Sequence, residues 1–162
     1  MFPSNAPNDY RCPVCLGIQR IENEHTLIAP TDIIQSDDTV SALISSFFVG
    51  NNRGHVLVVP TAHFENIYDL PAEVGHRIFD AAQAMAKLIK KTYRADGITI
   101  RQNNEPAADQ HAFHYHLHVY PRYRGDGFNE VTPERRFLAA RAERARYATR
   151  LRDALAGTAD EG

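Results

Sequence analysis

Hydrophobic and polar positions change their spacing along the chain, and the first part of the pattern predicts strands. Between Thr31 and Phe48, β-prone residues alternate with polar ones around the turn-forming residues 35–38, which predicts two strands joined by a tight turn. Residues 49–54 are rich in Gly and Asn and predict a loop. The apolar run from His55 to Pro60 then predicts a buried strand.

A helical spacing begins after Pro71, a residue type that is favoured at the first position of a helix. Apolar side chains recur every three or four positions until Asp96 and Gly97 end the pattern. The segment therefore predicts one long helix. Its apolar positions are Val74, Ile78, Ala81, Ala82, Met85, Leu88 and Ile89.

Two more strands and a last helix complete the prediction. Residues 98–102 and 114–120 predict strands, and residues 103–109 predict the loop between them. Thr132–Glu134 is a helix-start signal, and the Arg- and Ala-rich stretch up to Ala156 predicts a helix. Because the helices are inserted between and after more numerous strands, we predict an α+β fold with an antiparallel sheet, one long central helix and a C-terminal helix.

Composition and charge narrow the classes of function. The 162 residues suffice for one domain, and 43% apolar with 23% charged residues is an ordinary globular balance. A formal charge of -2 gives no reason to expect a polymeric nucleic acid or an anionic membrane as a partner. No apolar run approaches the roughly 20 residues that span a bilayer, and the first residues lack an export signal. With two cysteines and no disulfide framework, we expect a cytoplasmic protein.

Four of the eight histidines fall within residues 111–118. In a strand, alternate side chains share a face, so His114, His116 and His118 would lie on one surface. A lone buried histidine is usually structural. Burying three polar imidazoles that have no function would cost folding free energy, so three together indicate a functional site. Neighbours on one face lie roughly 6.6 Å apart at Cα, so two of them could bind a metal that has further ligands. Alternatively, a neutral imidazole can attack phosphorus if its neighbours fix its tautomer and neutralise the phosphate oxygens.

The histidine cluster lies in a longer recognisable segment. Residues 103–123, NNEPAADQHAFHYHLHVYPRY, resemble the signature of the histidine triad (HIT) family of nucleotide hydrolases and transferases. Residues 12–15 (CPVC) and 54–63 (GHVLVVPTAH) also resemble bacterial members of that family. The resemblance implies a HIT domain at residues 12–128, preceded by a flexible N-terminal arm at 1–11 and followed by a C-terminal helix and tail at 129–162. It also implies a homodimer, for which the long helix is a candidate interface.

The resemblance assigns roles to individual side chains near the phosphates of a nucleotide substrate. His116 matches the family nucleophile, which takes an α-phosphoryl group together with its nucleoside. His118 matches the histidine that contacts the phosphate. Asn104 and Gln110 match amide side chains that bind the phosphates as neutral donors. His111 is placed with these phosphate-binding residues, and for it donating a proton to the leaving group and lying unused on the surface both stay open.

The implied activity is that of a nucleotide hydrolase. It would cleave a nucleoside phosphoramidate or a dinucleoside polyphosphate at the α-phosphate, through a covalent nucleotidyl-histidine, and release a nucleoside monophosphate. Two other interpretations stay open. One is a zinc-stabilised nucleotide-binding protein without turnover, and the other is a nucleotidyltransferase or phosphorylase that uses phosphate or a sugar phosphate in place of water.

Cys12 and Cys15 have the spacing of a redox pair and of half a tetrahedral zinc site, and they can also be two unreactive thiols. The missing thioredoxin-like context argues against redox chemistry. In zinc-bearing HIT relatives the ligands resemble Cys12, Cys15, His63 and His114, the first histidine of the catalytic triad. The resemblance therefore implies a structural zinc ion that joins the N-terminal arm to the triad.

The chain also departs from the family pattern. Glu105 and Asp109 stand where the family usually has Gly, and residues 45–51 lack the acidic residue that many members use for the ribose hydroxyls. The arginines near the C-terminus we interpret as one solvated face of the last helix. They are Arg135, Arg136, Arg141, Arg144, Arg146 and Arg150.

Overall fold

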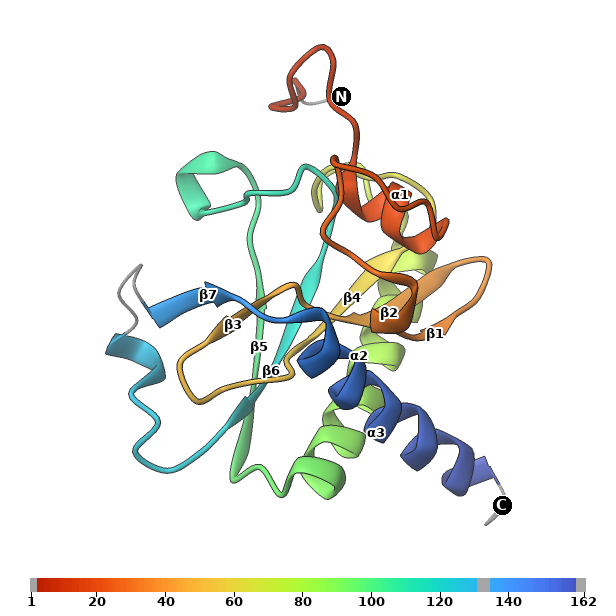
Figure 1. The fold of residues 1–162 in the computed structure, drawn as a ribbon. Coiled ribbons are helices and arrows are strands. Elements are labelled where there is room, and N and C mark those ends of the chain that lie inside the picture. Colours follow the sequence, from red (N-terminus) through yellow and green to blue (C-terminus); the bar gives the residue numbers. More distant parts are fainter. Residues whose placement is uncertain (1–2, 131–134, 160–162) are drawn as a thin grey trace.

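The strands form two antiparallel sheets in the computed structural model, which describes residues 3–130 and 135–159 (Figure 1). The larger sheet has the order β1-β2-β4-β6-β5, and the smaller one pairs β3 with β7. The predicted α+β fold with an antiparallel sheet is therefore confirmed. The strands are β1 (Ile33–Ser36), β2 (Val40–Ile44), β3 (Phe47–Val49), β4 (Val56–Pro60), β5 (Gly97–Gln102), β6 (Leu117–Arg122) and β7 (Arg136–Leu138).

Three α-helices accompany the sheets in the described residues. No helix among them is long and apolar enough to cross a membrane. The α-helices are α1 (Pro13–Ile18), α2 (Ala72–Tyr93) and α3 (Arg141–Ala159), and short 3-10 helices lie at Pro30–Asp32, Pro106–Ala108 and Phe128–Glu130.

Local hydrogen bonds explain the turn between the first two strands. The carboxylate of Asp37 accepts hydrogen bonds from the N–H groups of Thr39 and Val40, each at 2.8 Å. The chain then returns so that Ser41 lies opposite Ser36. These contacts confirm the predicted hairpin.

The long helix α2 also matches its prediction. Pro71 precedes its first residue, and the helix ends where Arg94 takes the left-handed conformation with φ of 55°. It thus stops just before the predicted end at Asp96. The apolar stripe is buried, which removes its surface from water and holds the helix on the sheet. The buried members include Ile78, Ala82, Met85, Leu88 and Ile89.

The larger sheet has an apolar layer on each face. α2 packs against β2, β4, β5 and β6, and α3 packs against α2, β1 and β2. The second face is covered in part by α1, whose Val14 packs with Ile28, Leu43 and Val59. Leu57 joins this second layer, and His118 lies opposite Leu57 in the β4–β6 pair. The third triad histidine therefore belongs to the face that α1 partly covers.

The predicted strand at 114–120 is displaced, because β6 begins only at Leu117. Its partner β4 ends at Pro60, which has no N–H with which to continue a ladder. The N–H of Tyr115 instead donates to the carbonyl oxygen of Phe64 at 2.6 Å. His114 and His116 therefore lie in a segment that precedes the strand.

The predicted C-terminal helix is wrong in its first part. Residues 136–138 form β7, which pairs with β3 so that Phe137 lies opposite Phe48. β3 in turn includes Val49, the first residue of the predicted loop. The helix α3 begins at Arg141, and the predicted start signal at 132–134 lies outside the described residues.

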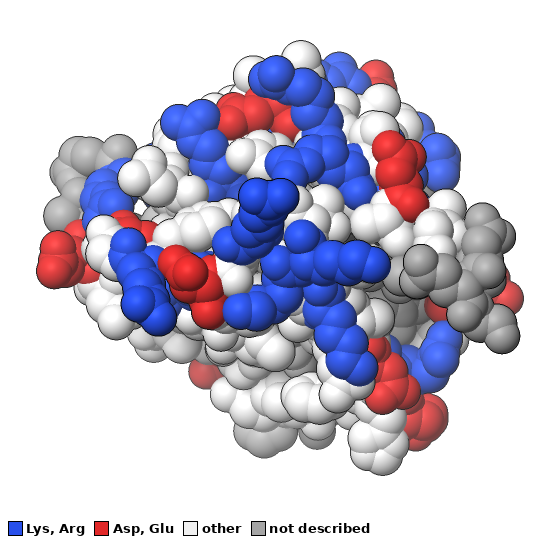
Figure 2. Space-filling model, turned by 90° about the horizontal axis from the view of Figure 1, so that it is seen from below, with Lys and Arg blue, Asp and Glu red and all other residues white. Residues whose placement is uncertain are grey.

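The basic stretch is not uniformly exposed. Figure 2 shows lysine and arginine side chains spread over one end of the molecule, with aspartate and glutamate among them. Arg144 is an exception, because it is 2% exposed and lies 3.1 Å from the carboxylate of the fully buried Asp32. The interpretation of these arginines as one solvated helix face is therefore wrong for Arg144. It is also wrong for Arg136, which lies on β7, and for Arg135, which precedes β7 and donates to the carbonyl oxygens of Asp126 and Gly127.

Candidate functional site

A cleft of about 490 Å³ opens on the second face of the large sheet. Strand β6 contributes His118 and Tyr120, and the segment before it contributes His116. A wall of apolar residues next to a few polar groups is typical of a site for a small molecule. The apolar residues of the cleft include Val14, Leu27, Ile28, Phe47 and Val49.

His116 is held in one tautomer. The side chain is 8% exposed, and its Nδ1 lies 2.7 Å from the carbonyl oxygen of His114. Because a carbonyl oxygen only accepts, Nδ1 carries the proton and Nε2 of the neutral ring keeps its lone pair. Burial lowers the pKa of His116 below its ordinary value of 6.5. The ring that lines the cleft is therefore neutral, with its lone pair on Nε2.

His118 lies beside His116, with ring centroids 4.9 Å apart. Its Nδ1 lies 3.3 Å from Nε2 of His55 and 3.2 Å from the hydroxyl of Tyr120. Burial lowers the pKa of His118 well below 6.5 and the pKa of His55 to about 3, so both rings are neutral near pH 7. The contacts of His55 and Tyr120 with Nδ1 fix the orientation of the His118 ring.

Sequence reasoning did not single out His55 or Tyr120. Tyr120 follows His118 by two positions, so the strand period alone could have placed it on the same face. His55 comes to the site through the pairing of Val56 with Val119, which the sequence pattern does not specify. Among the described residues, Nδ1 of His55 has no hydrogen-bond partner although it is buried.

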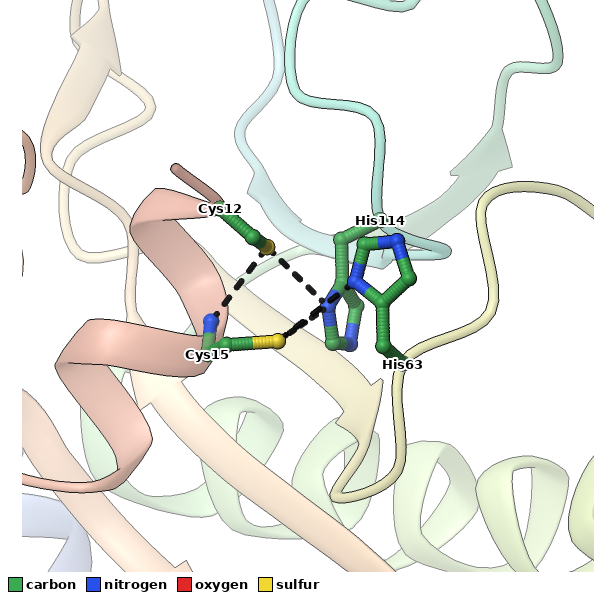
Figure 3. Close-up of side chains that lie close together, drawn as sticks. All are labelled: Cys12, Cys15, His63 and His114. Atoms are coloured by element: carbon green, nitrogen blue, oxygen red, sulfur yellow. Dashed lines mark hydrogen bonds between the residues drawn. The ribbon is translucent and has the colours of Figure 1, made fainter. Parts of the chain in front are cut away.

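His114 does not line the cleft but faces Cys12 and Cys15 (Figure 3). Its Nε2 lies 2.9 Å from the carbonyl oxygen of Pro60, so Nε2 carries the proton and Nδ1 turns its lone pair toward the cysteines. His63, which follows β4, approaches the same point. The expectation that three imidazoles share one surface is therefore wrong, because His114 turns toward the two cysteines while His116 and His118 line the cleft.

The Cys12, Cys15, His63 and His114 side chains, hereafter the Cys/His cluster, fit a tetrahedral metal ion. All four ligand atoms lie within 4.8 Å of one another. For Zn–S and Zn–N bonds of about 2.3 and 2.05 Å, sulfur and nitrogen atoms of a tetrahedron are about 3.5 Å apart. Three such distances here are 3.4 Å: from Sγ of Cys12 to Nδ1 of His114, and from Sγ of Cys15 to Nδ1 of His63 and of His114.

The two thiols of the Cys/His cluster differ in their pKa. A hydrogen bond from the Cys15 thiol lowers the pKa of Cys12 strongly, and His114 and His63 lower it further, whereas the same contact with Cys12 raises the pKa of Cys15. The thiolate form is the one that binds a metal ion. With four protein ligands, a bound ion would have no open position, which is the arrangement of a structural site.

Tyr10 joins the N-terminal arm to the triad segment. Its hydroxyl accepts a hydrogen bond from the N–H of Phe113 at 2.9 Å, and the two rings pack edge to face with centroids 5.5 Å apart. Ser4 and Asn5 contact the carboxylate of Glu65. The described part of the arm thus packs beside the Cys/His cluster, while its flexibility stays a prediction.

Gln110 and Asn104, the predicted phosphate-binding amides, do not line the cleft. Gln110 is 2% exposed; its Oε1 accepts from the N–H of Glu105 and its Nε2 donates to the carbonyl oxygen of Glu65, each at 2.6 Å. Oδ1 of Asn104 accepts from the N–H of Ile67 at 2.8 Å. Both amides hold the loop in place.

The loop before β6 lines the cleft with Asn103, Asp109, His111 and Ala112. Oδ1 of Asn103 accepts a hydrogen bond from Nε of Arg101 at 3.0 Å, and its Nδ2 donates to the carbonyl oxygen of Ala108. The amide at the cleft is therefore one position earlier than the resemblance suggested. His111 lies where the sequence places it, near the triad.

Comparison with known proteins decides the family. A model of the HIT domain matches residues 26–125. The chain belongs to the HIT family. Protein hit of Bacillus subtilis is 36% identical to it over 103 residues, which are 63% of this chain and 70% of that protein.

Solved HIT structures have the same fold. A zinc-bound histidine triad family protein from Mycobacterium smegmatis superposes with a TM-score of 0.73 at 28% identity, over 93% of this chain and 97% of that one. A diadenosine triphosphate hydrolase from Plasmodium falciparum gives a TM-score of 0.68 over 96% of this chain and 90% of that one. At 15% identity, that second likeness shows a common fold and no more.

Two departures from the HIT pattern now have a structural meaning. Glu105 has φ of 68° and ψ of 160°, and Asp109 has φ of 65° and ψ of 29°. At both positions the backbone keeps the positive φ that glycine adopts most easily, although neither residue is glycine. For Glu105, whose conformation is nearly exclusive to Gly, this costs about 1–3 kcal/mol of folding free energy. The Asp109 carboxylate lies 3.5 Å from the guanidinium of Arg101, which offsets its negative charge in the cleft.

Proposed function

We propose that the chain is a nucleotide hydrolase of the histidine triad type. Its substrate is a nucleoside phosphoramidate or a dinucleoside polyphosphate, which it cleaves at the α-phosphate to release a nucleoside monophosphate. The observation that carries this proposal is the neutral His116 in the cleft, with Nδ1 bound to the carbonyl oxygen of His114. That contact leaves Nε2 as the only ring atom with a lone pair for attack.

In the first step, Nε2 of His116 bonds to the α-phosphorus with its lone pair. The bond from phosphorus to the leaving nitrogen or oxygen breaks, and its electron pair goes to the leaving group. The hydrogen bond from Nδ1 to the His114 carbonyl stabilises the positive charge that the ring gains. When the Tyr120 hydroxyl donates to Nδ1 of His118, the Nε2–H of His118 is free to donate a hydrogen bond to a phosphate oxygen, and the leaving group takes its proton from water.

In the second step, water attacks the same phosphorus atom. The bond to Nε2 of His116 breaks, its electron pair returns to the ring, and the proton of the attacking water goes to solvent. The apolar wall near Phe47 would hold the nucleoside through both steps. The cycle ends with a nucleoside monophosphate and a neutral His116.

We further propose that zinc occupies the Cys/His cluster. The cluster has the distances of a tetrahedral site, and the relative from Mycobacterium smegmatis is a zinc-bound protein. Bound zinc supplies rigidity and no open position for chemistry. It would fix His114, whose carbonyl oxygen sets the tautomer of His116. The homodimer and the cytoplasmic location stay predictions.

Hydrolysis assays test the proposed activity. The purified chain is incubated with adenosine and guanosine phosphoramidates and with dinucleoside polyphosphates, each with and without inorganic phosphate. We expect nucleoside monophosphate from at least one substrate in water alone. A product that forms only with inorganic phosphate would show the phosphorylase instead, and nucleotide binding without any product would show the binding protein.

Two histidine variants make this assay specific. His116→Ala removes the nucleophile, so we expect turnover to be abolished while nucleotide still binds. His76→Ala is the matched control, because His76 is an exposed histidine of α2 outside the cleft. Full activity in the His116→Ala protein would contradict the mechanism.

A further inference from the structure

Arg136 reaches the cleft from β7, which lies outside the residues that match the HIT domain model. In the β3–β7 pair, Arg136 lies opposite Val49, and Phe47 is two positions along on the same face. The guanidinium lies over the ring of Phe47, 4.5 Å from its centroid. Phe48 and Phe137 occupy the other face, where their rings pack edge to face. The small sheet thus turns one arginine toward the cleft.

The two arginines of the cleft differ in their charge balance. Arg101 pairs with the carboxylate of Asp109 at 3.5 Å. Within residues 3–130 and 135–159, Arg136 forms no ion pair with a carboxylate, although its side chain lines the cleft. No carboxylate of the described residues therefore balances the positive charge that Arg136 brings to the cleft.

We infer that Arg136 binds a second phosphoryl group of the substrate, beyond the one that reacts with His116, and so favours substrates with more than one phosphate. This inference rests on the proposed function. A guanidinium presents planar N–H groups that match phosphate oxygens, and its stacking on Phe47 holds that plane in place. A second phosphate would offset the charge that Arg136 brings to the cleft.

Substrate preference tests the inference. The ratio kcat/KM is measured for diadenosine triphosphate and for adenosine 5′-phosphoramidate with wild type and Arg136→Gln. We expect the variant to lose about 10- to 100-fold on the triphosphate, the range for a hydrogen bond to a charged group, and less than about threefold on the phosphoramidate. An equal loss on both substrates would overturn the inference.

Arg53→Gln is the matched control. Its guanidinium lies 5.4 Å from the ring centroid of Phe137, on the other face of the same small sheet, and it does not line the cleft. The substitution removes the same charge, so we expect less than about a threefold change on either substrate. Arg136→Lys keeps the charge but loses the planar stack, and it should recover only part of the preference.

A binding measurement separates this inference from the proposed hydrolysis. In the His116→Ala protein, which cannot turn over by the proposed route, calorimetry measures affinity for AMP, ADP and adenosine 3′,5′-bisphosphate with and without Arg136→Gln. If Arg136→Gln weakens the binding of ADP alone, by about tenfold, Arg136 binds a phosphate of the polyphosphate chain. If it weakens the binding of the bisphosphate instead, Arg136 binds a phosphate on the ribose. Unchanged binding of both would refute the role of Arg136, even if hydrolysis is confirmed. If no substrate is hydrolysed but this discrimination is found, the proposed function fails and the role of Arg136 stands.

Discussion

Replacing Arg144 with Met removes a buried guanidinium that ties α3 to the segment before β1. Arg144 lies 3.1 Å from the Asp32 carboxylate and donates to the carbonyl oxygens of Leu27 and Ala139 at 2.9 and 3.3 Å. Removing one partner of a buried ion pair costs about 3–5 kcal/mol, because the other charge stays buried and unpaired. That is a large share of a typical unfolding free energy of about 5–15 kcal/mol. For a chain of this length the thermal midpoint should fall by roughly 6–20 °C.

The loss should depend on pH in a defined direction. Burial raises the pKa of Asp32 above its ordinary value of 3.8, and the Arg144 charge opposes that rise. Without Arg144 the pKa rises further, so the buried carboxylate takes up a proton at a higher pH. A group whose folded pKa is raised destabilises the fold above that pKa, and the penalty disappears as pH falls toward 3.8. The difference from wild type is therefore largest at neutral pH and shrinks in acid.

Urea unfolding of Arg144→Met at neutral and mildly acidic pH measures both effects. Arg141→Met is the control, because Arg141 is on the same helix and pairs with Glu22 at the exposed surface. An exposed pair contributes about 0–1 kcal/mol, so the control should unfold almost as wild type does. Adding Asp32→Asn to Arg144→Met should recover part of the loss. Equal stability of the two arginine variants would refute the assignment of the buried pair.

Two further predictions concern the metal and the loop. Purified chain should contain about one zinc per molecule, and Cys15→Ser should release it and lower the thermal midpoint, because structural zinc contributes folding free energy; metal analysis that finds no zinc in protein prepared without chelator would contradict this. Glu105→Gly should raise the unfolding free energy by about 1 kcal/mol, because glycine adopts the backbone conformation at φ of 68° without strain. An unfolding free energy below that of wild type, measured in urea, would show that the contacts of Glu105 stabilise the fold by more than the strain costs.

Much of the fold was predictable because its signals are local. The Asp37 turn, the apolar run of β4 and the 3.6-residue stripe of α2 each act through neighbours in sequence. The Cys/His cluster was predictable only through the resemblance. Spacing alone left Cys12 and Cys15 open to three interpretations, and the matching His63 and His114 are distant in sequence.

The errors arose where tertiary pairing overrides a local pattern. The Arg- and Ala-rich residues before Arg141 favour a helix, but pairing with Phe47–Val49 makes residues 136–138 a strand. The histidine alternation suggested one face, but the end of β4 at Pro60 left His114 outside the ladder. No sequence pattern indicates that Arg144 is buried, because its partner Asp32 lies in a different part of the chain.

Trapping the covalent intermediate tests the central claim most directly. Wild-type protein is mixed with substrate, quenched rapidly without acid and examined by intact mass measurement and peptide mapping. We expect a nucleoside monophosphate adduct on His116 that is stable in base and labile in acid, as a phosphoramidate is, and that is absent from His116→Ala. An adduct on His118 or His111 would contradict the assignment of the nucleophile, and steady turnover with no adduct on any histidine would contradict the covalent mechanism.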